Sequence, residues 1–286
     1  MIIFNGEYRG NLNYRSQWSS IGDPYRTAHA AFDMPISDKW SLGASVFNQN
    51  SGGGAYNNLQ AVVSASYDIA LGVDKYSHLL LGAGLGINNK SFDPSKIIFG
   101  DQYGVNGSTI ATSESFGKTS VLIPEVNAGL LFYDGNPFRT INYFIGATAF
   151  HLPEFNQNFS GTASPLYRRY LVHGGFRIKA SRLLEITPQA MVMYQNRAQE
   201  IIPGASLQYH LTDADAYLIA GASYRVDDAI VPYAGLQFKE YSLGLSYDIT
   251  ISDLDAANKS RGGLEISLIY IKKPKVARPK FICPRI

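Results

Sequence analysis

Hydrophobic and polar residues alternate along most of this chain. The alternation predicts β-strands with one wet and one apolar face, because successive side chains of a strand point to opposite sides. It recurs at 57–70, 239–251 and 262–273, and no comparable stretch has a helical period. The first clear segment places Glu7, Arg9, Asn11, Asn13, Arg15 and Gln17 on one face and Tyr8, Leu12, Tyr14 and Trp18 on the other.

The lengths of these segments favour strands that cross a membrane. Strands in soluble sheets usually have about 5–6 residues, whereas a tilted strand needs about 9–11 to cross a bilayer. The sequence therefore predicts an all-β fold, a transmembrane antiparallel β-barrel of about fourteen strands. The expected strands lie near 6–18, 25–36, 38–50, 57–70, 75–88, 119–133, 139–151, 166–179, 182–195, 197–210, 214–225, 229–238, 239–251 and 262–273.

The connections between these segments alternate in length. Outer-membrane barrels have short periplasmic turns and longer outer loops, so an even number of strands predicts that both chain ends are periplasmic. The short connections are Ser37-Asp38, 72–74, 134–137, 180–181 and Asp213, and the longer ones are 19–24, 51–56, 89–118, 152–165 and 252–261. Two further outer connections, around Asn196 and Asp227, are shorter. We expect the barrel to occupy 1–273 and a basic, proline-containing periplasmic tail to occupy 274–286.

A soluble β-sandwich is the structural alternative, since its buried face produces a similar alternation. The strand lengths, the alternating connections and the many aromatic residues at strand ends favour the barrel. Pro124 and Pro188 fall inside expected strands, where proline cannot donate a ladder hydrogen bond. We expect them to mark β-bulges or strand ends.

Charge and cysteine content exclude several functions. Lys and Arg number 25 against 23 Asp and Glu, a net charge of +2, which gives no reason to expect a nucleic-acid partner. A single Cys excludes a disulfide framework and a cysteine-based zinc site. We therefore expect no cofactor.

The polar faces of the strands carry charges of both signs, which we expect to pair inside a barrel, because unpaired charge in a confined space is costly. The histidines, His29, His78, His151, His173 and His210, are scattered over different segments without a serine motif. The sequence therefore does not predict an enzyme. The charged positions are Glu7, Arg9, Arg15, Asp33, Asp68, Glu125, Arg177, Glu185, Asp248 and Glu265.

The longest connection is more apolar than a solvated loop requires. Exposed aromatic and aliphatic clusters are typical of binding anchors, so this loop is a candidate partner-binding surface. The alternative is that the same side chains fold back and cap the lumen. The candidate residues are Phe92, Ile97, Ile98, Phe99, Tyr103 and Phe116.

Two short motifs, one near each end, resemble the PorP/SprF family of the type IX secretion and gliding machinery. The family's Arg-Ser-Gln-Trp element matches Arg15, Ser16, Gln17 and Trp18. The segment Arg278-Pro279-Lys280-Phe281-Ile282-Cys283-Pro284-Arg285-Ile286 is similar to its closing motif, with Ile286 in place of the usual aromatic residue. Family members begin with a signal peptide and an Asn-Pro-Ala-Tyr-Ala-Gly-like stretch, and the first family segment is expected to be missing here.

The resemblance implies a non-enzymatic barrel in the bacterial outer membrane, in contact with lipid. Its implied partners are a secreted adhesin or the C-terminal domain of one, which the barrel anchors, or periplasmic components of the secretion system, which it links to the membrane. The functional alternative is a channel for a small hydrophobic or polar solute. Such channels carry an N-terminal hatch, for which this sequence leaves little room before the first strand.

Overall fold

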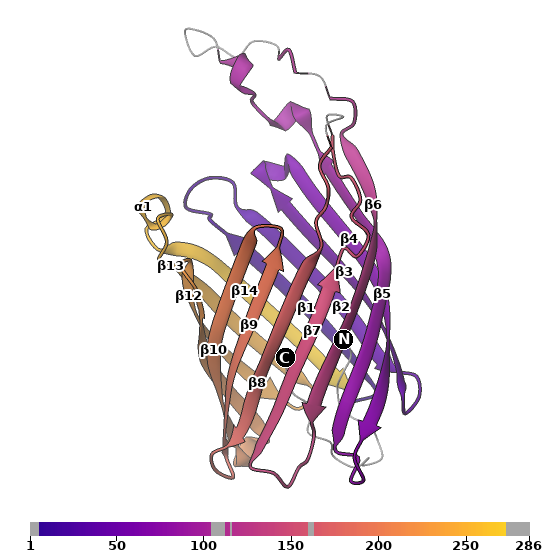
Figure 1. The fold of residues 1–286 in the computed structure, drawn as a ribbon. Coiled ribbons are helices and arrows are strands. Elements are labelled where there is room, and N and C mark those ends of the chain that lie inside the picture. Colours follow the sequence, from indigo (N-terminus) through magenta and orange to yellow (C-terminus); the bar gives the residue numbers. More distant parts are fainter. Residues whose placement is uncertain (1–5, 104–111, 115, 160–162, 273–286) are drawn as a thin grey trace.

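The computed structural model is a closed antiparallel β-barrel (Figure 1). It describes residues 6–103, 112–114, 116–159 and 163–272. Each strand pairs with its sequence neighbours, and the first strand pairs with the last, in register from Tyr8↔Lys272 to Gln17↔Gly263. The strands are β1 (Tyr8–Gln17), β2 (Tyr25–Pro35), β3 (Trp40–Ser51), β4 (Tyr56–Leu71), β5 (Ser77–Phe92), β6 (Ser120–Asp134), β7 (Ile141–Phe150), β8 (Arg169–Lys179), β9 (Leu184–Gln195), β10 (Ala198–Leu211), β11 (Ala216–Arg225), β12 (Ala229–Phe238), β13 (Tyr241–Thr250) and β14 (Arg261–Lys272).

In the described residues, helical structure occurs only as short segments in the connections between strands. Single 3₁₀ turns lie at Gly52–Gly54, Pro94–Lys96, Gly100–Gln102 and Thr212–Ala214, and the helix α1 spans Asp255–Asn258. Over the described ranges, no helix has the length and apolar character needed to span a membrane. In the turn between β3 and β4, Gly52, Gly53 and Gly54 all have positive φ (59°, 61° and 90°), which explains why three glycines stand together there.

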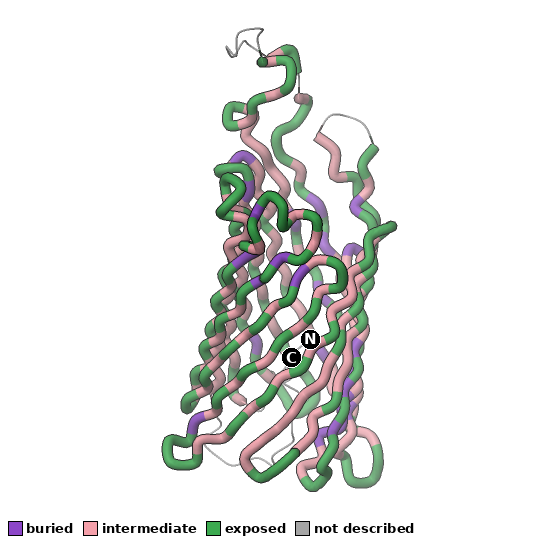
Figure 2. The backbone as a smooth tube through the Cα atoms, turned by 90° about the vertical axis from the view of Figure 1, so that its left-hand side faces the viewer, coloured by how far each residue is buried: buried purple, intermediate pink, exposed green. Residues whose placement is uncertain are grey.

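The outer face of the barrel is apolar and the inner face is polar, as the alternation predicts. Along β13, for example, Leu243 and Leu245 point outward and are 50% and 49% exposed, whereas Asp248 points inward and is 5% exposed. Figure 2 shows the same alternation of exposed and less exposed residues along the strands. In an isolated barrel the exposed apolar face is the one that contacts lipid.

Aromatic side chains of several strands lie near the end of the barrel that carries the short turns. Their rings contact one another across neighbouring strands, and such belts mark the interface between lipid and water. The contacting pairs are Tyr8–Tyr270, Tyr8–Phe32, Tyr241–Tyr270, Phe132–Tyr143 and Trp40–Tyr67, with ring centroids 4.9–5.9 Å apart.

Long and short connections lie at opposite ends of the barrel. The predicted alternation is confirmed: the turns after β2, β4, β6, β8, β10 and β12 are short, and the long connections 93–119 and 151–168 are at the other end. We call this second end the loop-side mouth. Residues 93–103 rise well above the rim there (Figure 1). The first residue of β1 and the last residue of β14 lie at the short-turn end.

The prediction that Pro124 and Pro188 mark bulges or strand ends was wrong, since both lie inside strands. The β5–β6 register runs without a shift through Ile87↔Pro124, and β6 pairs with β7 only from Ala128 onward. The β8–β9 register is interrupted between Gly175↔Gln189 and Ile178↔Ile186, where Pro188 lies. Each proline therefore occupies a position where one neighbouring ladder is absent, so the missing N–H breaks no hydrogen bond.

The two faces predict opposite responses to the same substitution on β13. Leu243→Arg or Leu245→Arg places a charge in the lipid and should lower the free energy of unfolding by about 2–4 kcal/mol. Ser246→Arg points into the lumen beside Glu265, its cross-strand neighbour, and should have a much smaller effect. Heat-modifiable mobility in gels and denaturant titration in detergent measure both variants. Equal destabilisation by Leu245→Arg and Ser246→Arg would contradict the assignment of faces.

Candidate functional site

The loop-side mouth combines three structures that the other end lacks: an extended part of the wall, a long loop and a loop that folds inward. Strands β4, β5 and β6 continue beyond the level at which β7 ends, because Ser91↔Ser120 still pair while β7 stops at Phe150. The loop 93–119 connects the tops of β5 and β6. The loop 151–168 leaves β7 and covers the inner face of this extended wall, where Ile123 and Glu125 are each 1% exposed.

The aromatic residues of the longest connection pack mainly on one another. Phe92 contacts the rings of Phe116 and Phe159 edge to face, with centroids 4.9 Å apart in both cases. Phe99 packs on Phe116 at 5.3 Å. We call Phe92, Phe99, Phe116 and Phe159 the aromatic cluster. It joins the base of loop 93–119 to loop 151–168.

The predicted partner-binding residues therefore divide into two groups. Phe92, Phe99 and Phe116 belong to the aromatic cluster, and Ile97 is partly covered. Ile98 and Tyr103 remain 56% and 67% exposed. Phe159, which completes the cluster, was absent from the prediction because it lies in a different connection, and the sequence does not show that the two loops meet.

Polar contacts hold the upper part of loop 93–119. Asp101 accepts hydrogen bonds from the Ser113 backbone N–H (2.6 Å) and hydroxyl (2.8 Å) and from the Thr112 hydroxyl (3.0 Å). These bonds lower the pKa of the Asp101 carboxyl below its ordinary value, and the bond from the Ser113 N–H contributes most. The carboxylate thus ties the outgoing half of the loop to the returning half.

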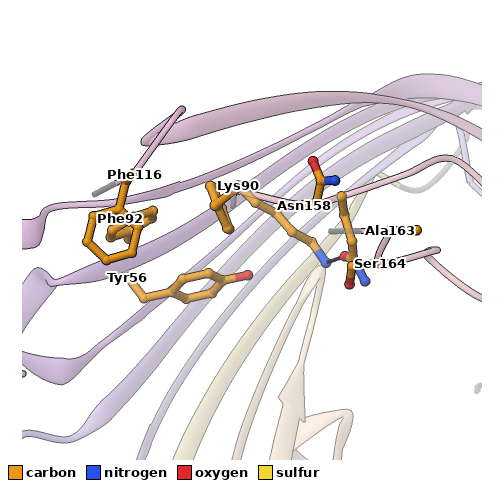
Figure 3. Close-up of a pocket in the computed structure, with 9 residues that line it drawn as sticks. Tyr56, Lys90, Phe92, Phe116, Asn158, Ala163 and Ser164 are labelled. Carbon is orange, nitrogen blue, oxygen red and sulfur yellow. Dashed lines mark hydrogen bonds between the residues drawn. The ribbon is translucent and has the colours of Figure 1, made fainter. Parts of the chain in front are cut away.

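A cavity of about 600 Å³ opens between the extended wall and the two loops (Figure 3). Lys90 lies on one side and donates a hydrogen bond from Nζ to Gln157 Oε1. Figure 3 shows Tyr56 and the aromatic cluster residues Phe92 and Phe116 at the other side. The cavity is therefore partly aromatic and partly polar. Its lining residues are Tyr56, Lys90, Phe92, Phe116, Gln157, Asn158, Phe159, Ala163 and Ser164.

Buried Glu125 fixes the start of loop 151–168. The His151 ring Nδ1 lies 2.7 Å from Glu125 Oε2, and the His151 backbone N–H donates to Glu125 Oε1 at 3.3 Å. His151 has a φ of +56°, a conformation that turns the chain out of β7. The contact explains how a carboxylate that is 1% exposed has its hydrogen-bonding capacity used.

An ionic network closes the barrel at the opposite side of the mouth. Arg15 on β1 lies 2.5 Å from Asp248 on β13 and 3.6 Å from Glu265 on β14. Arg225 on β11 contacts the same Asp248 at 3.2 Å and Glu200 on β10 at 3.0 Å. The network spans β10 to β1 on the lumen face and therefore bridges the seam where the first and last strands meet.

The expectation that lumen charges pair is confirmed for most of the predicted positions. The other pairs on the inner face join neighbouring strands, so they cross-link the wall from inside. They are Arg9–Asp33 (3.0 Å), Arg177–Glu185 (2.5 Å) and His78–Asp68 (2.9 Å).

The Arg15-Ser16-Gln17-Trp18 motif lies at this seam. Gln17 packs on Gly263, where an added Cβ would come within 2.9 Å of Gln17 Cγ. The Trp18 N–H donates to the Gly262 carbonyl at 2.7 Å, and its ring packs edge to face on Tyr25 at 5.0 Å. Each of these contacts helps to hold the end of β1 against β14 or β2. The remaining motif residues, Arg278, Cys283, Pro284 and Arg285, lie outside the described residues.

The histidines do not form a catalytic arrangement in the described part of the chain. His78 and His151 each contact a carboxylate, and His210 packs against Tyr217 with ring centroids 4.4 Å apart. His29 and His173 lie on other strands, β2 and β8. Among the described residues, no group of three or more His, Cys, Asp or Glu side chains could hold a metal ion.

Solved structures share this fold at low sequence identity. The toluene transporter TbuX of Ralstonia pickettii has a TM-score of 0.57 and 10% identity, with 95% of this chain and 90% of TbuX covered. The monoaromatic hydrocarbon channel CymD has a TM-score of 0.55 and 11% identity, with 96% and 90% covered. A mutant of the monoaromatic hydrocarbon channel TodX has a TM-score of 0.54 and 11% identity, with 95% and 91% covered. No curated protein matches the chain.

The closed barrel, its lipid-facing apolar wall and its polar, charge-paired lumen define an integral β-barrel of the bacterial outer membrane. The family of type IX secretion system membrane proteins PorP/SprF matches residues 3–270. The chain therefore belongs to the PorP/SprF family, as its Arg15–Trp18 motif indicated.

The seam network predicts a measurable contribution of Arg15 to barrel stability. Arg15→Gln removes the contacts to Asp248 and Glu265, and hydrogen bonds to charged groups contribute about 1.5–3 kcal/mol. We expect a loss in that range, measured by denaturant titration in lipid vesicles. Arg182→Gln, in an exposed short turn, is the control and should change the free energy of unfolding little. A stability equal to wild type for Arg15→Gln would show that the network does not hold the seam.

Proposed function

We propose that this barrel holds a secreted surface protein, such as an adhesin or its C-terminal domain, at the outer face of the outer membrane. The main support for this proposal is that the two long loops and the extended part of the wall lie together at the loop-side mouth. Membership in a type IX secretion family supports a function in protein export. The wall faces lipid, so a partner at the surface has the loops and the extended part of β4–β6 to bind.

The exposed residues of loop 93–119 have the character of binding anchors. Ile98 and Tyr103 present large apolar surfaces to solvent, and aromatic residues are enriched among the side chains that dominate interface energies. The aromatic cluster beneath them and the Asp101 hydrogen bonds hold residues 93–103 to Thr112, Ser113 and Phe116 before any partner arrives. A pre-ordered loop loses less conformational entropy on binding, which favours affinity.

Two other functions remain as candidates. A link to periplasmic secretion components would use the short-turn end and the tail 274–286, which is outside the described residues, so its assignment as a periplasmic tail stays a prediction. A solute channel is the second alternative, but the likeness to TbuX, CymD and TodX shows the fold alone. We place both behind surface anchoring because the two longest connections, 93–119 and 151–168, are at one mouth.

The proposal requires the loop-side mouth to be outside the cell, and the start of β1 and the end of β14 to be periplasmic. Ile98→Cys and Tyr103→Cys should react with a membrane-impermeant thiol reagent on intact cells. Val73→Cys and Phe138→Cys should react only after the outer membrane is opened. Val73 and Phe138 are suitable controls because they lie in short turns and are 104% and 83% exposed. Labelling of the short-turn pair on intact cells would reverse the orientation.

The binding surface is tested by polar substitution of its exposed side chains. Ile98→Ser with Tyr103→Ser should reduce the surface-retained partner at least about 10-fold, since anchors at interfaces contribute about 1–2 kcal/mol or more each. Val73→Ser with Phe138→Ser is the matched control at the other end. Barrel abundance and partner abundance are measured separately on intact cells. Normal barrel levels with full partner retention in the first variant would exclude this surface.

Replacing 94–115 with a short Gly/Ser turn extends the test to the whole loop. The barrel should still assemble, because the β5–β6 ladder ends at Ser91↔Ser120, below the deleted residues. The surface partner should be released into the medium. Deletion of 278–286 should instead impair secretion or assembly. A loop-trimmed barrel that keeps its partner would identify the loop as a cap over the lumen.

A further inference from the structure

The upper part of β6 is a strand edge without a neighbour in the described part of the chain. Strand β6 begins at Ser120, but its pairing with β7 covers only Ala128 to Tyr133. Just after β7, the Leu152 N–H still donates to the Val126 carbonyl. Residues 120–125 therefore extend past the last bond to this neighbour, for roughly 20 Å at about 3.3 Å per residue. The sheet β4–β5–β6 ends there in a free side.

The hydrogen bonds of the flanking residues show which groups point to this free side. The Phe92 N–H donates to the Thr119 carbonyl at 2.9 Å, so the backbone N–H and C=O groups of odd-numbered β6 residues point toward β5. The Leu152 N–H donates to the Val126 carbonyl at 3.0 Å, so the backbone N–H and C=O groups of even-numbered residues point to the side where β7 would continue. By this alternation Ser120 and Leu122 present both an N–H and a C=O to the free side, and Pro124 presents a C=O.

The side chains of this segment leave the edge accessible from outside. Ile123 and Glu125 point inward and are covered by loop 151–168. Leu122 points outward and is 62% exposed, and Pro124 beside it is also exposed. The outward neighbours on β5 are Leu85 and Ile87, which are 60% and 51% exposed.

The edge lies at or above the top of the lipid-facing band. Outward positions change from apolar to polar near Leu122: Asn89 is its cross-strand partner, and the Ser120 hydroxyl contacts Asn89 Oδ1 at 2.9 Å. Unpaired backbone groups are not tolerated in the hydrocarbon region. The open donors and acceptors are therefore placed where water or a partner reaches them.

We propose that residues 120–124 of β6 accept an extended strand from the secreted partner by β-augmentation. The incoming segment would pair with the backbone of Ser120, Leu122 and Pro124, and its outward side chains would be apolar, to continue the surface of Leu122 and Ile87. Main-chain hydrogen bonds supply the affinity in this mode of recognition, and alternate side chains supply the specificity. The inference rests on the proposed anchoring function and adds a backbone contact to the one made by the exposed side chains of loop 93–119.

A strand from the partner fits this edge better than a second copy of the chain. Pro124 lacks an N–H. If two copies paired here by two-fold symmetry, one short ladder would lack a hydrogen-bond donor at two positions. Proline at an edge also discourages uncontrolled pairing of identical edges. A strand from a different protein faces only one missing donor, and any of its residues can lie opposite Pro124.

The first test measures backbone protection in the wild-type barrel. The probe is the purified C-terminal domain of a surface protein exported by the same secretion system, added to the barrel in detergent. Hydrogen exchange followed by mass spectrometry should show that the amides of Ser120 and Leu122 are protected at least about 10-fold by the domain. Binding of the domain without protection at these amides would overturn the strand-addition inference and leave surface anchoring intact. Failure of the domain to bind would overturn both.

The second test removes one edge donor by substitution. Leu122→Pro deletes the free-side N–H but breaks no bond to β5, because Leu122 occupies the same kind of position as Pro124. It should weaken binding of the domain at least about 5-fold, from one lost hydrogen bond and the clash of the ring with an incoming strand. Leu122→Ala keeps the N–H and is the matched control, with a smaller effect. Equal binding by both variants would overturn the inference.

Folding and self-association are measured on the same samples. Heat-modifiable mobility shows that each variant barrel is assembled, and hydrogen exchange in the wild type needs no variant at all. Light scattering gives the oligomeric state. A wild-type dimer that Leu122→Pro converts to a monomer would assign the edge to a second copy and overturn the partner strand.

Discussion

The need to satisfy every backbone polar group inside the membrane governs this structure. Lipid offers no hydrogen-bond partner, so a chain that crosses it as strands must close its ladder on itself. Closure depends on one pairing of distant segments, β1 with β14. The Arg15–Asp248–Arg225 network and the Gln17–Gly263 contact lie at that pairing. They reinforce the one junction between strands that are not consecutive in the chain.

The same requirement explains where the ladder is allowed to stop. Prolines Pro124 and Pro188 lie where one neighbouring ladder is absent, and the free edge of β6 lies where the outward side chains become polar. Inside the lumen, most of the charges lie close to an opposite charge on another strand, as in Arg9–Asp33, Arg15–Asp248 and Arg177–Glu185. The longest stretch of β6 without a β7 partner lies at the loop-side mouth, which is also where a binding surface can vary, whereas the interruption at Pro188 covers only two pairs of the β8–β9 ladder.

Much of the fold follows from local sequence, because the period of two and the connection lengths are local properties. The alternation along β13 and the asymmetry of the loops are examples that the structure confirms. Less of the candidate site could be predicted from the sequence. The partner of Arg15 is two strands away, so finding Asp248 requires the register of β13 and β14 as well as their order. The contact of Phe92 with Phe159 and the early end of β7 depend on how the loops fold together. A lone proline in a strand gave an ambiguous signal, because its meaning depends on the neighbouring ladder.

The pairing of β1 with β14 also sets the order in which the barrel can be completed. It joins residues 8–17 to residues 263–272, so the contact that closes the wall has nearly the greatest sequence separation the chain permits. Hairpins between consecutive strands have low loop-closure entropy and can form early, whereas this closing contact forms slowly. Until then, both terminal strands expose a complete edge. A chain interrupted before β14 would keep those edges, so an exposed β1 distinguishes an unfinished barrel from a finished one for any assembly or degradation machinery that reads strand edges.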